Sequence, residues 1–238
     1  DTSMNQSSRR DIIVIGASAG GVRVVSDLLT ALPHDLPASV FVVIHTLPQS
    51  ELLSRVLGRT SALPVRDAED GEVIAKSRVY VAPADRHLLI DDKVRLSRGP
   101  KENRHRPGID PLFRSAALYY GPRVIGVILT GNLDDGTAGL FEIKRTGGLA
   151  LVQDPEEAVS SGMPRSALRY VDVDYCVPLA RMKELLPQLC AEPAVAARSG
   201  GASSRELLAK EIEISERMPN AMQNSETLGK PTGFTCPD

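Results

Sequence analysis

This sequence has few cysteines, no large excess of charge of either sign and no long hydrophobic run. Its 238 residues include three cysteines, an odd and widely spaced set that does not resemble a disulfide framework and fits a reducing compartment: Cys176, Cys190 and Cys236. The formal net charge of -2 argues against the strongly basic surface that general nucleic-acid binding needs. No apolar run approaches the roughly 20 residues that span a bilayer, and residues 1–10 lack the apolar segment of a signal peptide. We therefore expect a cytoplasmic protein with no nucleic-acid partner and no membrane insertion; its oligomeric state stays open.

Short apolar runs alternate with helical patterns along most of the chain, which indicates repeated β-α-β units around a mostly parallel sheet. The runs are continuous because strands of such a sheet are buried on both faces. The predicted fold class is α/β: a doubly wound, Rossmann-like three-layer domain with helices on both faces. We predict its strands at residues 12–17, 39–45, 78–83, 124–131, 149–154 and 174–178.

Two segments between these strands have distinct patterns. Residues 87–97 form two alternating runs joined by a short polar turn, which predicts a small antiparallel β-hairpin. The stretch DPLFRSAALYYG predicts a helix with Asp110 as its N-cap, Pro111 at its first position and Gly121 at its end. Another helix begins near Gly21.

The chain divides into one domain with two flanking segments. We expect residues 1–10 to be a disordered lead or a cloning remnant, and residues 11–190 to form the domain. From residue 191 alanine, serine and charged residues replace the strand pattern, so 191–238 is a tail that is partly helical near 204–218.

The stretch DIIVIGASAGG, residues 11–21, fits two kinds of site. A dinucleotide-binding turn needs a glycine where Ser18 stands and an acid at the end of the second strand, where the sequence has His45. Gly16 to Gly20 instead match G-x-S-x-G in a strand-turn-helix context, which is typical of a nucleophilic serine. A tight packing turn is the simpler alternative.

A serine nucleophile needs a base and a group that orients the base. His45 ends a strand on the same sheet edge as Ser18, and Asp134 and Asp135 follow another strand there. Structural roles compete with this hypothesis, because strand-end histidines are often packed and aspartates often cap helices. Of the remaining histidines, we interpret His34 as solvated and His87 as packed or locally hydrogen-bonded.

Six stretches in order resemble the catalytic domain of CheB, the chemotaxis protein-glutamate methylesterase: GASAGG, VVIH, YVAPADRHLLI, NRHRPGIDPLFRSAA, LTGNLDDGTAG and VQDPEEAVSSGMPRSAL. The resemblance covers about residues 10–190. It implies a serine hydrolase that removes methyl esters from glutamates on the cytoplasmic helices of chemoreceptors, releases methanol and, in some members, deamidates receptor glutamines. It implies no metal and no cofactor.

Carried over by position, the resemblance makes Ser18 the nucleophile, His45 the general base and Asp135 the residue that orients it. The oxyanion would be held by backbone amides at Ala19 and Asn132. Where this chain has Ala19, Asn132 and Leu133, the family usually has threonine, methionine and glycine, and the loop after His45 is longer.

These departures keep a second hypothesis open, a catalytically weak relative that binds partners in a sensory complex. The family's usual receiver domain has no counterpart before the first strand, so we expect a different form of regulation. Nucleotide binding is a third hypothesis, disfavoured by His45.

A basic cluster at Lys101, Arg104, His105 and Arg106 has two interpretations, the second of which concerns the last three residues above all. It is either a solvated loop or a substrate-binding group that attracts glutamate-rich receptor helices to the site.

Overall fold

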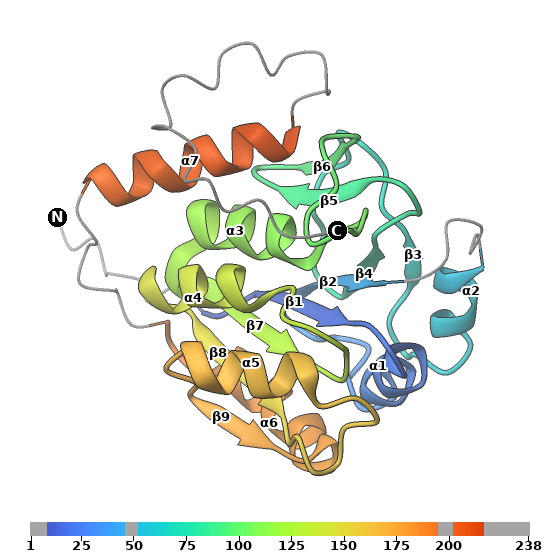
Figure 1. Cartoon of the computed structure of the whole chain (residues 1–238). Coiled ribbons are helices and arrows are strands. Elements are labelled where there is room, and N and C mark those ends of the chain that lie inside the picture. The colour runs from blue at the N-terminus through green and yellow to red at the C-terminus, as the bar shows by residue number, and fades with distance from the viewer. Residues whose placement is uncertain (1–8, 46–51, 195–201, 217–238) are drawn as a thin grey trace, which may run out of the picture.

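A parallel sheet forms the centre of the protein. The structure is a computed structural model, and it describes residues 9–45, 52–194 and 202–216. The strand order of the sheet is β3-β4-β2-β1-β7-β8-β9, so β1 lies between β2 and β7 (Figure 1). The strands are β1 Ile12–Ala17, β2 Ser39–Ile44, β3 Val65–Asp67, β4 Arg78–Val81, β7 Val124–Ile128, β8 Leu149–Gln153 and β9 Tyr175–Val177. The predicted doubly wound parallel sheet is confirmed, and β3 is an additional edge strand.

Helices cover both faces of this sheet, as expected for three layers (Figure 1). One face carries α1 Gly21–Leu29, α2 Leu53–Gly58 and α6 Leu179–Ala191. The other carries α3 Ile109–Tyr120, α4 Thr137–Arg145 and α5 Gly162–Tyr170. A short 3-10 turn, Gly121–Arg123, joins α3 to β7. Each face buries its own apolar cluster against the sheet, and no helix in the described ranges is long and apolar enough to cross a bilayer.

The predicted hairpin is confirmed, but it forms a separate two-stranded sheet. Strands β5 His87–Ile90 and β6 Val94–Ser97 pair antiparallel and pack beside α3. His87 is fully buried: its Nε2 lies 2.8 Å from the carbonyl oxygen of Pro100, and its Nδ1 accepts the amide of Gly108 at 3.1 Å. This agrees with the predicted local hydrogen-bonding role. His34 is exposed, as expected.

The prediction of Asp110 as an N-cap is wrong. Helix α3 begins at Ile109 with Gly108 as its N-cap, which places Pro111 in the first turn rather than at the first position. The Asp110 carboxylate instead accepts the amide of Gly139 on α4 at 2.7 Å, a tertiary hydrogen bond that local capping rules do not foresee. Gly121 ends the helix as predicted.

Helix α7, Ala202–Glu216, lies across α3 and the hairpin (Figure 1). It buries Leu208 and Ile212 in the cluster on that face, and it also buries Ser215. The predicted helix near 204–218 is thus present and belongs to the folded unit. At the other end, Arg10, which lies within the expected lead, donates a hydrogen bond to the Pro193 carbonyl at 3.2 Å and so contacts the folded unit.

Gly139 allows α3 and α4 to approach closely. A Cβ at this position would lie 2.4 Å from the Cβ of Phe113, far inside van der Waals contact. Gly139→Ala is therefore expected to lower the free energy of unfolding by about 1–3 kcal/mol, because the two helices must separate. Urea denaturation measures this, with the exposed neighbour Ala138→Ser as a control; equal midpoints for wild type and Gly139→Ala would contradict the tight contact.

Candidate active site

Ser18 lies in the turn between β1 and α1. Its amide donates to the Thr130 carbonyl at 2.9 Å, and its own carbonyl accepts the amide of Gly21 at 2.8 Å. Gly20, the N-cap of α1, supplies the left-handed backbone of the turn with φ 79°, which glycine adopts without a steric cost. The Ser18 side chain is half-buried and stands at the carboxyl edge of the central strand.

Ser18, His45 and Asp135 form a hydrogen-bonded series. Ser18 Oγ lies 3.2 Å from His45 Nδ1, and His45 Nε2 lies 2.7 Å from Asp135 Oδ2. The three residues follow β1, β2 and β7, which are adjacent in the sheet and parallel, so their carboxyl ends meet. An ionised Asp135 accepts a hydrogen bond from the protonated Nε2, which leaves the Nδ1 lone pair facing the serine hydroxyl.

The Asp135 carboxylate is 2% exposed and accepts four hydrogen bonds in all. Besides His45, its donors are the amides of Ile109 at 2.8 Å and Asp110 at 3.2 Å, and Asn103 Nδ2 at 2.8 Å. Burial alone would raise the pKa of Asp135. The hydrogen bond and charge of His45 outweigh it, together with the Ile109 and Asn103 donors, and the pKa of Asp135 is lowered to about 2. Asp135 therefore stays ionised, and it caps α3 rather than α4, whose N-cap is Gly136.

Asp110 is a second buried carboxyl, adjacent to Asp135. Burial and then the charge of Asp135 raise the pKa of Asp110 to about 7. Two neighbouring carboxyls seldom ionise together in a buried site, so Asp110 holds its proton below neutrality while Asp135 does not. Asn103 Nδ2 bridges the pair, at 2.9 Å from Asp110 Oδ2.

This shift predicts a pH-dependent stability. A carboxyl ordinarily releases its proton near pH 3.8, so the folded chain binds one more proton than the unfolded chain up to about pH 7. The contribution of Asp110 to the free energy of unfolding is full below pH 3.8 and is lost as pH rises through 7. Between pH 5 and pH 8, the stability of the wild type relative to Asp110→Asn should fall by about 3 kcal/mol.

Urea denaturation of both proteins at several pH values measures this difference. The exposed neighbour Asp134→Asn serves as the control. A difference between wild type and Asp110→Asn that stays constant with pH would show that Asp110 binds no proton near neutrality.

The basic cluster divides into three different environments. His105 stacks on His45 with ring centroids 3.6 Å apart and planes 9° apart, and burial followed by the charge of His45 lowers the pKa of His105. Arg106 pairs with Asp85 Oδ1 at 2.7 Å and donates to the Gly99 carbonyl at 2.8 Å. Arg104 is exposed. Lys101 is exposed as well, so two of the four members have the position that a solvated loop predicts for the whole cluster.

The backbone amides of Ala19 and Asn132 have no acceptor among the described residues, and the same is true of their neighbours Gly20 and Leu133. The amides of Ser18 and Gly131 already have acceptors. Ser18 donates to the Thr130 carbonyl, and Gly131 donates to the Ser160 carbonyl at 2.9 Å. Leu133, where the family usually has glycine, keeps a left-handed backbone with φ 64°. A residue with a side chain adopts this backbone at a steric cost of roughly 1–2 kcal/mol. The longer loop after His45 falls in 46–51, outside the described residues.

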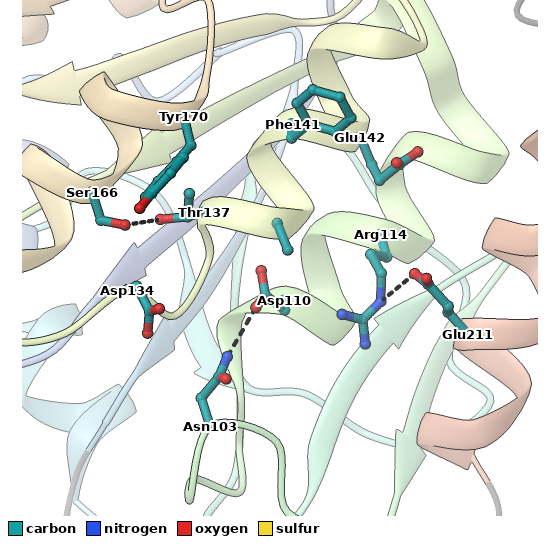
Figure 2. A pocket seen from close by; sticks show the side chains of 11 residues that line it. Asn103, Asp110, Arg114, Asp134, Thr137, Phe141, Glu142, Ser166, Tyr170 and Glu211 are labelled. Atoms are coloured by element: carbon teal, nitrogen blue, oxygen red, sulfur yellow. Dashed lines mark hydrogen bonds and ion pairs between the residues drawn. The ribbon is translucent and has the colours of Figure 1, made fainter. Parts of the chain in front are cut away.

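A pocket of about 410 Å3, lined by residues that include Asn103 and Asp110, was not foreseen from the sequence. Figure 2 shows Asn103 pointing to Asp110 at one end, Ser166 bonded to Thr137 on one side and Arg114 facing Glu211 on the other. Phe141 and Tyr170 form its outer rim. No three metal-binding side chains gather at one point in the described part of the chain.

Comparison with known proteins identifies the relatives of this chain. A family model described as CheB methylesterase matches residues 13–186. The protein-glutamate methylesterase/protein-glutamine glutaminase 2 of Methanosarcina mazei is 39% identical over 189 residues, which cover 75% of this chain and 52% of the relative. Its Burkholderia lata counterpart, numbered 3, is 41% identical over 181 residues, or 74% and 50% of the two chains. The chain thus spans about half the length of these curated relatives.

The crystal structure of the Thermotoga maritima CheB methylesterase catalytic domain superimposes with a TM-score of 0.73 at 39% identity, covering 77% of this chain and 99% of that one. Fold and site together define a class, doubly wound α/β proteins with serine, histidine and aspartate hydrogen-bonded in series at the sheet edge. Within that class, the chain belongs to the CheB methylesterase family.

Proposed function

We propose that this chain is a serine hydrolase that removes methyl esters from glutamate side chains on the cytoplasmic helices of chemoreceptors. The observation that carries the proposal is the series Ser18 Oγ, His45 Nδ1 and Asp135 Oδ2, joined at 3.2 and 2.7 Å. Relatives named protein-glutamate methylesterase/protein-glutamine glutaminase support this substrate class and add deamidation of receptor glutamines. The proposed location is the cytoplasm, where those receptor helices lie.

In the proposed reaction, Ser18 Oγ attacks the ester carbonyl carbon while His45 Nδ1 takes the hydroxyl proton. The amides of Ala19 and Asn132 hold the oxyanion of the tetrahedral intermediate. His45 then returns the proton to the methoxy oxygen, the bond to methanol breaks, and a γ-glutamyl ester of Ser18 remains. Water, deprotonated by His45, cleaves this ester to yield the glutamate carboxylate and the free serine.

Asp135 assists both halves of the reaction, because its negative charge stabilises the imidazolium that forms each time His45 takes a proton. Its low pKa keeps the carboxylate available at any pH at which His45 is a base. The proposed steps need no cofactor.

Methanol release from a receptor cytoplasmic fragment with methylated glutamates tests the proposal. We expect release by this protein, together with labelling of Ser18 by a fluorophosphonate, located by peptide mass spectrometry. If the protein binds the fragment but neither releases methanol nor reacts with the probe, the second hypothesis, a binding module in a sensory complex, replaces the esterase.

Arg104 is the residue we propose for electrostatic attraction of the acidic receptor helices. Arg104→Glu should raise KM about 3–10-fold at low salt with kcat unchanged, because an exposed charge acts on encounter and is screened by ions. Steady-state kinetics at two salt concentrations measure this, with the exposed Lys93→Glu on the hairpin as the control. Equal KM values for both variants would remove Arg104 from the binding surface.

A further inference from the structure

Asn103 occupies a turn built to hold its side chain in one place. The turn is closed by two backbone hydrogen bonds, from Glu102 N to His105 O at 3.1 Å and from His105 N to Glu102 O at 2.8 Å. Its two central residues, Asn103 and Arg104, have φ values of 48° and 68°. Such backbone is costly for residues other than glycine, and asparagine tolerates it better than most.

The turn is anchored from behind by residues distant in sequence. The Glu102 carboxylate accepts hydrogen bonds from Arg114 on α3 and from the Ser215 hydroxyl on α7. Arg114 Nη2 also lies 3.1 Å from Ser215 Oγ, and Ser97 Oγ donates to the Ser215 carbonyl at 2.8 Å. Three separate elements thus fix the position of the turn over the site.

The Asn103 amide reaches two carboxyls at once, Asp135 Oδ1 at 2.8 Å and Asp110 Oδ2 at 2.9 Å. Figure 2 shows the bond to Asp110. Asn103 is the only side chain among the described residues that donates to Asp135 apart from His45. Asp135 Oδ2, the oxygen that faces His45, also accepts the Ile109 amide at 2.8 Å, and hydrogen bonds to the opposite oxygen further restrict rotation of the carboxylate. Of the donors to that opposite oxygen, the Asp110 amide is the longer at 3.2 Å.

We infer that Asn103 is a positioning residue, which orients the Asp135 carboxylate toward His45 by bridging it to Asp110. The inference rests on the proposed function, because it assigns a role within that reaction. Asn103 touches no reacting atom and acts only through Asp135. A turn-forming preference alone would explain the backbone at this position but not the bridge, since Arg104 adopts the same backbone and makes no such contact.

The test distinguishes the effect of the backbone conformation at residue 103 from the effect of the Asn103 side chain. Asn103→Gly keeps the left-handed backbone and removes the amide, and Ser77→Gly is its matched control, a residue with φ 54° outside the site. We expect Asn103→Gly to lower kcat about 10–100-fold, as loss of a residue supporting a site commonly does, with KM within about twofold of the wild type. Ser77→Gly should leave both unchanged. Asn103→Ser, a milder change, should lower kcat by less than Asn103→Gly does.

A double-mutant cycle with Asp135→Asn shows whether Asn103 acts through Asp135. In that background Asn103→Gly should change single-turnover methanol release by less than about twofold. The inference is overturned if Asn103→Gly retains wild-type kcat, or if it lowers kcat by the same factor in both backgrounds. A wild-type kcat in Asp135→Asn itself would instead contradict the proposed function, so the two failures are distinguishable.

Discussion

Methanol release is expected to fall by about 10⁴-fold or more when Ser18 is replaced by alanine. The loss is large because the covalent route disappears entirely, whereas the oxyanion amides and substrate binding remain. Binding of the methylated receptor fragment should be unchanged, since the half-buried hydroxyl contributes little contact area. Methanol assayed in single turnovers, with calorimetric titration of the fragment, measures both quantities.

Ser26→Ala is the matched control for this experiment. Ser26 lies on the helix that follows Ser18, and its hydroxyl contacts only Thr60 Oγ1 at 3.3 Å among the described residues. It should retain full activity. Residual activity in Ser18→Ala above a few per cent of the wild type would mean that Ser18 is not the nucleophile and that water attacks the ester directly.

Asp135→Asn is expected to lower kcat by about 10⁴-fold, with a loss of stability as well. All four groups that contact the Asp135 carboxylate donate hydrogen bonds to it. The amide of asparagine can accept only through its one oxygen, because its NH2 group is itself a donor. If the NH2 group faces His45, then His45 Nε2 must accept, and its proton moves to Nδ1, where it faces the serine. If the NH2 group faces the other way, it meets Asn103 and the Asp110 amide.

The variant Asp134→Asn tests the specificity of this effect, because Asp134 is the adjacent acid and its side chain is exposed. Steady-state kinetics of both variants, with thermal melting, make the comparison. Equal losses in the two would assign the effect to the loop as a whole rather than to the contact between Asp135 and His45.

Much of the site followed from the sequence because it depends on strand order at one sheet edge. Continuous apolar runs placed Ser18, His45 and Asp135 after three strands, and parallel pairing then brings the ends of neighbouring strands together. The short edge strand β3 escaped prediction because three half-exposed or exposed residues carry neither a continuous nor an alternating pattern. The hairpin was visible because its two runs alternate.

Side-chain partners far apart in sequence were not predictable in the same way. Asp110 has the residue type and position of an N-cap, yet its partner Gly139 is 29 residues away. Arg106 belongs to a basic run that suggested a free surface, but Asp85 and the Gly99 carbonyl bind its guanidinium. Asn103 carried no local signal, because its importance arises only when two carboxyls from different elements meet it.

Helix α7 has a consequence for where this protein can be divided. The family match ends at residue 186, whereas Leu208, Ile212 and Ser215 of α7 fill space against α3 and the hairpin. A chain that is cut at residue 186 would expose the apolar surface beneath α7. It would also leave the side chains of Glu102 and Arg114 in contact with solvent. Homology thus marks a shorter unit than the packed one, and domain exchange with relatives should carry the helix along.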